Sequence, residues 1–313
     1  MNRKFVIGSR GSELALWQAN FIKSELEKNN NNISVEIKII KTTGDKITDV
    51  ALSKIGDKSL FTKELENELL NNNINIAVHS LKDLQTQLPR ELKLGAVTKR
   101  HPVEDVLIAK EKNISLKNLK KKAVVATGSL RRKSQLLNIR PDINVVELRG
   151  NVPTRIEKFL NSEWDAIILA RAGVERLGLE KNISSFIDAD EILPAVGQGA
   201  LGIEIRESDK ETENILKQIH DQETYYAVLA ERSLLRTLEG GCQVPIGTYS
   251  EIKVNELFMK AYVGSVNGKI AFRDNISGNK NDAEKLGKQL ADKLLNAGAK
   301  GILDEIFKTA RLK

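Results

Sequence analysis

Polar side chains that can do chemistry stand where predicted strands end. The alternating run 74–78 predicts a strand that leads into His79-Ser80-Leu81-Lys82-Asp83. Open α/β sheets bind ligands beyond the carboxyl ends of their strands, so this polar run is a candidate site. A helix cap is the open alternative, in which Asp83 or Ser80 only accepts hydrogen bonds from backbone N–H groups.

Cys242 is the second candidate, because the chain contains one cysteine. It follows Gly240 and Gly241, which predict a turn between a helix and a strand. A lone cysteine forms neither an internal disulfide nor a cysteine-cluster metal site, and we predict no metal site. Two interpretations stay open at this point: a small buried hydrophobic side chain, or a reactive thiol.

Arginines recur just after predicted strands. Strand 124–126 leads through Thr127, Gly128 and Ser129 to Arg131 and Arg132 in the first turn of a helix. The helix dipole disfavours cations there, so two arginines make sense if an anion lies among them. Other arginines that follow predicted strands are Arg10, Arg149, Arg155, Arg171 and Arg176. Pairing with a protein acid explains any single arginine more simply, whereas the repetition favours a shared site for carboxylates or phosphates.

The elements that position these residues predict an α/β fold with largely parallel sheets, because apolar strands alternate with amphipathic helices. The first strand is Phe5–Ile7, and Ser12 is the predicted N-cap of the helix that follows. The connector 192–201 contains glycine and proline and suits a hinge or return crossing between domains. A small third domain is predicted from a helix at 225–238, strands near 244–248, 258–263 and 269–272, and a helix at 282–296.

Length and composition limit the class of protein. A chain of 313 residues with 41% hydrophobic and 29% charged residues is typical of a soluble globular protein with two or three domains. The first residues lack a signal-peptide core and no long apolar run occurs, so we expect a cytoplasmic protein with a reduced thiol. The net charge of +7 is compatible with nucleic acid, a membrane surface or a polyanionic small molecule.

Six motifs in order make the chain resemble the porphobilinogen deaminase family over essentially its whole length. They are the segments 7–10 with 14–19, 78–83, 129–132, 148–151, 193–200 and 240–247. The resemblance implies an α/β fold of three domains: two like type II periplasmic binding proteins, with mixed sheets around a cleft, and a small C-terminal domain with an antiparallel sheet. The expected boundaries are 1–99 with 196–217, then 100–195, then 218–313 with the cysteine.

The resemblance also implies a transferase that joins four porphobilinogen molecules head to tail, with release of ammonia, to give hydroxymethylbilane in porphyrin and haem biosynthesis. It implies a dipyrromethane cofactor held through a thioether to Cys242, no nucleic-acid or membrane partner, and a monomer. Asp83 is the implied catalytic group, with Lys82. The implied cofactor-binding residues are Ser80, Lys82, Asp83, Thr127, Ser129, Arg131, Arg132 and Arg155. The implied substrate-binding residues are Arg10, Gln18, Arg149 and Arg176.

The chain departs from the family pattern at Asp57, Ser59, Gln85 and Gly128. Gly128 stands where a serine is commoner, so a hydroxyl contact near the cofactor carboxylates is expected to be missing. Two other classes stay open. A solute-binding module would explain the anion sites but not the third domain with its cysteine. A nucleic-acid-binding protein would explain the net charge but would place its basic residues across an exposed face.

Overall fold

The structure is a computed structural model that describes residues 3–28, 30, 32–46, 60–239 and 244–311. Contacts along the chain divide it into two compact units. The first holds the described residues of 1–48, 57–101 and 199–225, and the second holds those of 102–198 and 226–313. The finer division into three domains stays a prediction.

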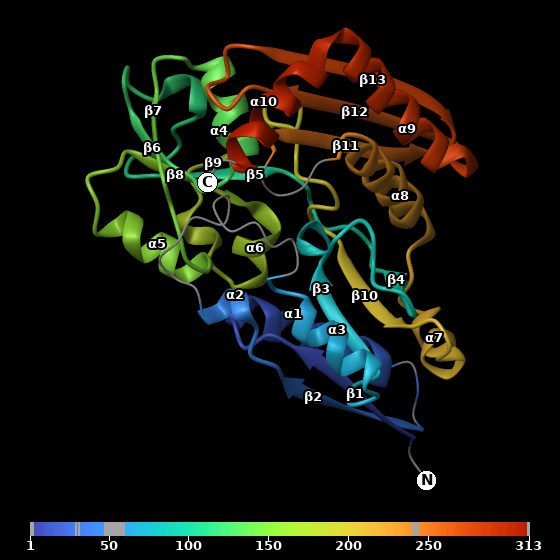
Figure 1. The fold of residues 1–313 in the computed structure, drawn as a ribbon. Helices are drawn as coiled ribbons and strands as arrows, with labels where there is room; N and C mark the ends of the chain where they lie inside the picture. The colour runs from blue at the N-terminus through green and yellow to red at the C-terminus, as the bar shows by residue number, and fades with distance from the viewer. Residues whose placement is uncertain (1–2, 29, 31, 47–59, 240–243, 312–313) are drawn as a thin grey trace. The chain divides into compact units, whose positions relative to one another are not determined.

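The first unit is built on a five-stranded mixed sheet with the order β2-β1-β3-β10-β4 (Figure 1). Its strands are β1 Arg3–Ser9, β2 Ile33–Ile39, β3 Ile76–Ser80, β4 Leu92–Val97 and β10 Leu201–Arg206. β1 pairs in parallel with β2 and β3, whereas β10 pairs antiparallel with β3 and β4. The carboxyl ends of β1 and β3 therefore lie at the same edge, together with the segments that follow Ser9 and Ser80.

Helices cover both faces of this sheet. They are α1 Glu13–Lys28, α3 Lys63–Leu70 and α7 Lys210–Leu216, and a further short helix, α2 Thr43–Lys46, follows β2. Successive residues of β3 point to opposite faces: Val78 packs in one hydrophobic cluster with Ile22 of α1, and Ala77 packs in another with Leu65 of α3. Ser12 caps α1 as predicted, because its Oγ accepts from the Ala15 amide at 3.4 Å.

The second unit has its own five-stranded mixed sheet, with the order β7-β6-β8-β5-β9. Its strands are β5 Asp105–Ala109, β6 Val124–Ala126, β7 Asn144–Val146, β8 Ala166–Ala170 and β9 Ser185–Ile187. β6 pairs in parallel with β7 and β8, so the carboxyl ends of these three strands share an edge. The helices that follow them are α4 Leu130–Ile139, α5 Val152–Leu160 and α6 Arg171–Arg176.

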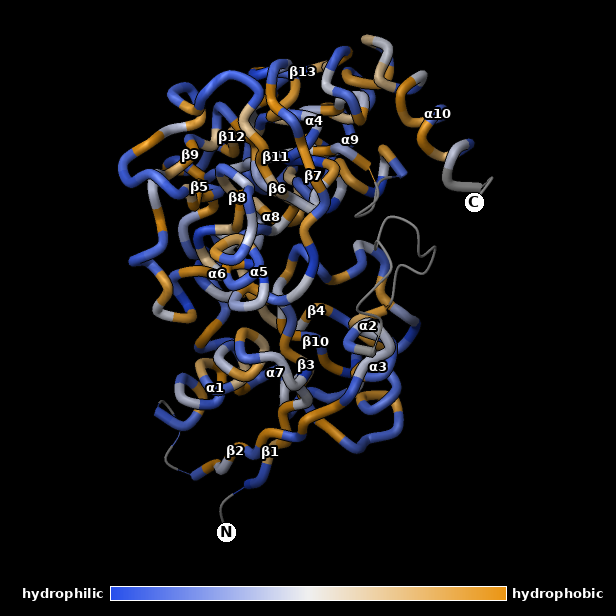
Figure 2. Tube along the Cα trace, turned by 90° about the vertical axis from the view of Figure 1, so that its left-hand side faces the viewer, coloured by the Kyte–Doolittle hydropathy of each residue, from blue (hydrophilic) through white to orange (hydrophobic). Residues whose placement is uncertain are grey.

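The C-terminal part of the second unit is an antiparallel sheet of β11 Ile246–Lys253, β12 Glu256–Gly264 and β13 Ala271–Asn279. Its helices are α8 Gln222–Thr237, α9 Ala283–Leu294 and α10 Lys300–Arg311. Leu257 and Met259 of β12 are buried with Leu234 of α8 and Leu290 of α9. Hydrophobic and hydrophilic residues alternate along α10 (Figure 2), which is typical of an amphipathic helix. The two mixed sheets and this antiparallel sheet confirm the α/β class and the sheet types that the resemblance implies. The expectation of largely parallel sheets is wrong, because β10 pairs antiparallel with β3 and β4, and β5 pairs antiparallel with β8 and β9.

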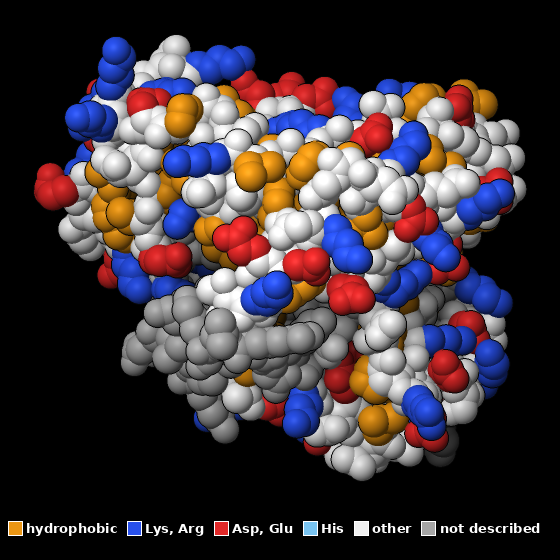
Figure 3. All heavy atoms as spheres, turned by 45° about the horizontal axis from the view of Figure 1, so that its top comes forward, with side chains coloured by type: hydrophobic (Ala, Val, Ile, Leu, Met, Phe, Trp, Pro, Cys, Tyr) orange, Lys and Arg blue, Asp and Glu red, His pale blue; other side chains and the backbone are white. Residues whose placement is uncertain are grey.

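The described surface carries charges of both signs. On the face drawn in Figure 3, lysine and arginine side chains are interspersed with aspartate and glutamate side chains. Large hydrophobic side chains such as Leu160 and Val254 are exposed singly, which is ordinary for a globular surface. Within the described ranges, no helix is both long and apolar enough to cross a lipid bilayer.

Candidate active site

Asp83 lies on a short turn at the carboxyl end of β3. A 3₁₀ turn, Leu81–Asp83, follows the strand directly, and the Leu81 amide donates to the carbonyl of Ala200 at 3.1 Å. The Asp83 side chain is exposed, and its carboxylate has no hydrogen-bond or ion-pair partner among the described residues. An exposed, unpaired carboxylate at this edge is available to a ligand, and the capping role left open by the sequence is not seen for it.

Ser80 and Gln18 meet one residue before this turn. The Ser80 side chain makes no capping bond to the turn in the described structure; its Oγ instead accepts from Gln18 Nε2 at 2.7 Å. Gln18 lies on α1 and is buried. Lys82 is half-buried between Leu81 and Asp83. The first unit therefore brings Gln18, Ser80, Lys82 and Asp83 to one region.

Arg10 follows β1 at the same sheet edge and is held by Asp45. Its Nε donates to the two Asp45 carboxylate oxygens at 3.1 and 3.3 Å, its Nη2 also bonds Asp45, and its guanidinium lies 4.1 Å from the centre of the Phe61 ring. Burial acts to raise the pKa of Asp45, but hydrogen bonds from Arg10 and Thr42 outweigh it, so the pKa lies below its usual value. The pair remains about a quarter exposed, at 25% for Arg10 and 29% for Asp45.

Arg131 and Arg132 share a buried protein carboxylate. Asp105 Oδ2 accepts from Arg131 Nη2 at 2.9 Å and from Arg132 Nε at 3.0 Å, and Oδ1 accepts from Arg132 Nη2 at 2.7 Å and from Gln198 Nε2 at 2.9 Å. Burial would raise the pKa of Asp105, but the two guanidinium charges hold it well below its usual range. The anion predicted among these arginines is therefore, in this structure, a carboxylate of the protein.

This buried cluster keeps an excess of positive charge. Two guanidinium groups face one carboxylate, and Arg131 Nε is buried without a hydrogen-bond partner among the described residues. Burial lowers the pKa of Arg131, and the attraction of Asp105 acts against that shift. A buried N–H donor that lacks a partner within the described ranges, such as Arg131 Nε, favours binding of an anion. The cluster is therefore compatible with a carboxylate-bearing cofactor.

Thr127 and Ser129 lie between β6 and α4, and their hydroxyl oxygens accept hydrogen bonds from nearby backbone amides. Ser129 caps α4, with its Oγ accepting from the Arg132 amide at 3.4 Å, and the Ser129 amide donates to Thr127 Oγ1 at 3.3 Å. A side chain at Gly128 would place its Cβ 2.5 Å from the carbonyl oxygen of Leu148. A larger residue at Gly128 would therefore require the Leu148 backbone to shift.

Arg149, Arg155 and Arg176 follow β7 and β8 at the shared edge of the second sheet. Arg149 Nε is buried and lacks a hydrogen-bond partner among the described residues. Burial lowers the pKa of Arg149, and Glu147 partly offsets this. Burial also lowers the pKa of Arg176, to about 10. Arg155 Nε donates to the carbonyl of Gly150 at 2.7 Å. Arg171, by contrast, pairs with Glu175 at 2.6 Å and is a structural arginine.

Three parts of the sequence analysis fall outside the described residues. Cys242, Asp57 and Ser59 lie in the ranges that the structure does not describe. The neighbouring elements are α8, which ends at Thr237, and β11, which begins at Ile246. The attachment role of Cys242 therefore stays a prediction.

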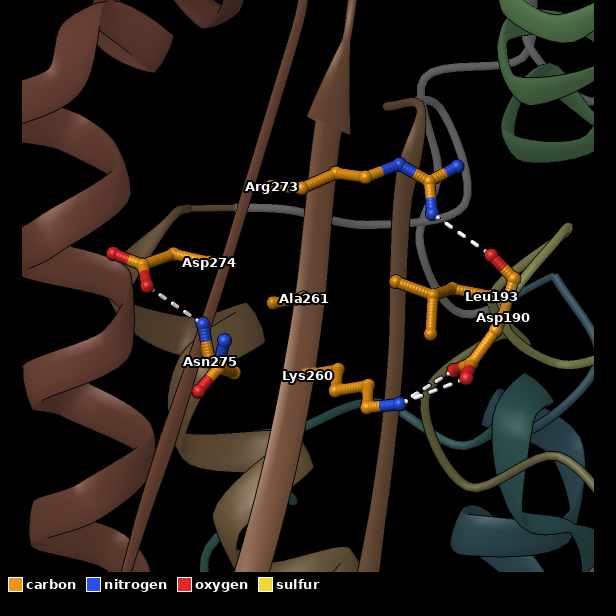
Figure 4. Close-up of a pocket in the computed structure, with 7 residues that line it drawn as sticks. All are labelled: Asp190, Leu193, Lys260, Ala261, Arg273, Asp274 and Asn275. Atoms are coloured by element: carbon orange, nitrogen blue, oxygen red, sulfur yellow. Dashed lines mark hydrogen bonds and ion pairs between the residues drawn. The ribbon is translucent and has the colours of Figure 1, made fainter.

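A pocket of about 150 Å³ occurs in the second unit, and none of the predicted site residues that the structure describes lines it (Figure 4). Lys260 Nζ contacts both Asp190 carboxylate oxygens at 2.7 and 2.9 Å, and Arg273 Nη1 donates to the Asp190 carbonyl at 3.1 Å. Both cations that line this pocket therefore bond Asp190, and the second acid in the lining, Asp274, accepts from the Asn275 amide at 2.7 Å. We interpret it as a packing junction between β12, β13 and the connector.

Sequence reasoning missed two carboxylates at the arginine sites, Asp45 and Asp105. Two arginines in the first turn of α4 signalled that an acid was needed, but Asp105 starts a strand that is antiparallel to its neighbours. Nothing in the spacing links Asp105 to Arg131. Asp45 lies in the segment that follows β2, and the parallel pairing of β1 with β2 brings that segment to Arg10.

The family models and the curated relatives that match the sequence agree on one family. A family model described as porphobilinogen deaminase, dipyromethane cofactor binding domain, matches residues 5–214, and the C-terminal domain model of the same family matches residues 225–296. The methionine binding protein MetQ gives a TM-score of 0.43 at 13% identity, over 73% of this chain and 93% of that chain. That likeness is weak, and the fold assignment rests on the sheets themselves.

Curated relatives match over nearly the full length. A porphobilinogen deaminase of Chloroherpeton thalassium is 50% identical over 310 residues, with 98% of this chain and 98% of that protein covered. One of Prochlorococcus marinus is 50% identical over 314 residues, with 100% of this chain and 99% of that protein covered. The chain belongs to the porphobilinogen deaminase family.

Proposed function

We propose that this chain joins four porphobilinogen molecules head to tail, with release of ammonia, and that Asp83 is the group that makes the step possible. The observation that carries the proposal is the exposed carboxylate of Asp83, which has no partner among the described residues and lies at a strand end. Arginine-rich strand ends in both units supply binding groups for the acetate and propionate side chains of the substrate.

The role of Asp83 follows from the charge that develops in the substrate. When ammonia leaves the aminomethyl carbon of porphobilinogen, positive charge spreads over the pyrrole ring, whose N–H needs an acceptor. A fixed carboxylate next to that ring stabilises the charge and accepts the hydrogen bond. Lys82, adjacent in the chain, is proposed to assist catalysis and to bind substrate or cofactor carboxylates.

The arginines are proposed to hold carboxylates of the cofactor and of the growing chain. Each added ring brings two carboxylates, and charge-assisted hydrogen bonds contribute about 1.5–3 kcal/mol each. Cofactor binding is assigned to Arg131, Arg132 and Arg155, with Ser80, Lys82, Asp83, Thr127 and Ser129. Substrate binding is assigned to Arg10, Gln18, Arg149 and Arg176.

A dipyrromethane cofactor fits the donors present. Arg131 Nε and Arg149 Nε are buried without hydrogen-bond partners among the described residues, and the Asp105 cluster has an excess of positive charge. When bound, this group supplies a covalently held pyrrole as the primer for chain growth. We propose Cys242 as its attachment point, which resolves the two open interpretations of this thiol in favour of reactivity.

The mass of the purified protein tests this proposal most directly. The intact mass should exceed the sequence mass by one dipyrromethane unit, and a Cys242→Ala variant should lack both the increment and ammonia release from porphobilinogen. A Cys242→Ser variant is the size-matched control, because serine has nearly the same size as cysteine and carries a hydroxyl group where cysteine carries the thiol. An unmodified Cys242→Ala protein that still turns over would contradict the proposal.

The proposal also covers the binding partner, the oligomeric state and the location in the cell. Porphobilinogen is the proposed partner, and we propose a monomer that works in the cytoplasm. The arginines that we assign to cofactor and substrate binding follow the ends of strands. On the face drawn in Figure 3, basic and acidic side chains are interspersed. Light scattering at micromolar protein concentration should give the mass of one chain; a stable dimer would contradict the monomer.

A further inference from the structure

A buried, hydrogen-bonded pair of polar side chains, His79 and Glu204, lies beneath the turn that carries Asp83. His79 is on β3 and Glu204 is on the neighbouring antiparallel strand β10. His79 Nε2 lies 3.0 Å from Glu204 Oε2, and a carboxylate only accepts, so the imidazole N–H donates. His79 is 6% exposed and Glu204 is 0% exposed. No part of the proposed reaction uses either side chain.

The stability of the fold does not explain this pair. Glu204 Oε1 is buried without a hydrogen-bond partner among the described residues, so the carboxylate is only half satisfied. Burying such a group costs free energy, and replacing a buried ionic pair by apolar side chains of similar volume is often neutral or stabilising. A pair that does not favour stability calls for another role.

The position of the pair indicates that role. His79 and Ser80 are the last two residues of β3, and their side chains point to opposite faces of the sheet. Ser80 is held on one face by Gln18 at 2.7 Å, and His79 is held on the other face by Glu204. The strand end is therefore fixed on both faces immediately before the turn of Asp83.

β10 holds the same turn at two further points. The Leu81 amide donates to the carbonyl of Ala200 at 3.1 Å, just before β10 begins. The Leu81 side chain lies over Gly202, where an added Cβ would be 2.6 Å from Leu81 Cδ1. Gly202 is the register partner of His79, so these contacts and the Glu204 bond act on one short stretch of backbone.

We propose that His79 and Glu204 are positioning residues for Asp83: their buried bond fixes the end of β3, and with it the place of the exposed carboxylate. This inference rests on the proposed function of Asp83. A misplacement of about 1 Å at a reacting group can lower a rate about 100-fold, whereas substrate binding by arginines elsewhere is untouched. The pair should therefore affect kcat and leave KM nearly unchanged.

The test is a double apolar variant, His79→Leu with Glu204→Leu, in the full-length holoenzyme. We expect a thermal midpoint close to that of the parent, a kcat for ammonia release lower by about 10- to 100-fold, and a KM within about twofold. Glu204→Gln keeps the size and an acceptor oxygen, so it should retain kcat within about threefold.

Asp209→Ala is the matched control for stability in the same unit. Asp209 caps α7, accepting from the Thr212 amide at 2.9 Å, and pairs with Arg206 at 2.7 Å, away from the end of β3. This variant should lower the thermal midpoint and leave kcat unchanged. A lower kcat in Asp209→Ala of the same size as in the double variant would overturn the inference, because destabilisation alone would then slow turnover.

Two further outcomes decide the matter. A folded double variant with the parent kcat would overturn the inference and leave the proposed function intact, because the parent turns over in the same assay. If the double variant does not fold, Glu204→Leu alone replaces it, because it breaks the same bond by changing one buried side chain instead of two. The same loss of kcat in Glu204→Leu supports the inference, and a parent-like kcat overturns it.

Discussion

Two carboxylates hold arginines in this molecule under opposite conditions of burial. Asp105 is fully buried between Arg131 and Arg132 in the second unit, whereas Asp45 and Arg10 in the first unit are each about a quarter exposed. Both carboxyl groups have a pKa below the usual value, and in both cases the arginine bonds outweigh the effect of burial.

The difference teaches how one kind of ion pair serves two purposes. A buried carboxylate cannot leave its guanidinium partners without stranding charge in a medium of low polarity, so Asp105 fixes the two arginines. An exposed pair contributes at most about 1 kcal/mol, which is compatible with the proposed role of Arg10, in which a substrate carboxylate takes the place of Asp45. Asp83 is the limiting case, a carboxylate without a cation among the described residues.

The largest expected effect is the removal of the buried carboxylate. Asp105→Ala should lower the free energy of unfolding by about 3–5 kcal/mol, because two buried guanidinium groups lose their counter-charge. Urea unfolding measures this, with Asp45→Asn as the exposed counterpart. A loss below about 1 kcal/mol would erase the distinction between the two clusters.

Removal of the Asp83 carboxylate, which is unpaired in the described structure, should have the opposite effect: a large loss of rate and a small change in the free energy of unfolding. Asp83→Asn keeps the shape and most of the capping capacity but removes the charge, so we expect the rate of ammonia release to fall about 10²–10⁴-fold. The free energy of unfolding should change by about 1 kcal/mol or less. Asp83→Glu keeps the charge and should retain partial activity. A destabilised but fully active Asp83→Asn protein would assign Asp83 to the structure alone.

The dependence of the unfolding free energy on pH should also differ between Asp105 and Asp45. The pKa of Asp105 is lowered on folding from an ordinary 3.8, so its contribution to stability is complete above that value and is lost as the pH falls through the folded-state pKa. We expect the acid decline in unfolding free energy, below about pH 4, to be shallower in Asp105→Asn than in the parent. Asp45→Asn should change that slope less. Equal slopes in the parent and Asp105→Asn would contradict the prediction.

The smallest effect is expected at the exposed pair. Asp45→Asn should change the free energy of unfolding by about 1 kcal/mol or less and lower the KM for porphobilinogen by about two- to fivefold, since Arg10 no longer has an internal competitor. Steady-state kinetics at low salt measures this. An increased KM would show instead that Asp45 orients Arg10 for the substrate.

The elements and the strand ends were predictable from the sequence, and the ion-pair partners were not. Apolar runs such as 124–126 and 166–170 are buried strands in the structure because a sheet covered on both faces requires them. Strand lengths were less predictable: β1 extends to Arg3 because backbone pairing with Ile33 continues under polar side chains. The Asp105 bonds to Arg131 and Arg132 depend on the antiparallel strand β5. The position of β5 in the sheet cannot be predicted from the spacing of residues along the sequence.

The place of β10 in the first sheet sets an order of folding. β10 lies between β3 and β4, yet it is synthesised about 100 residues after β4, while the five strands of the second sheet are all complete by Ile187. At ribosomal rates of about 5–20 residues per second, the edge of β3 stays unpaired for roughly 5–20 s after β4 has emerged. The sheet that begins first in the sequence is therefore finished after the second five-stranded sheet. During that interval the nascent chain presents an open strand edge, the kind of surface that chaperones cover and that aggregation exploits.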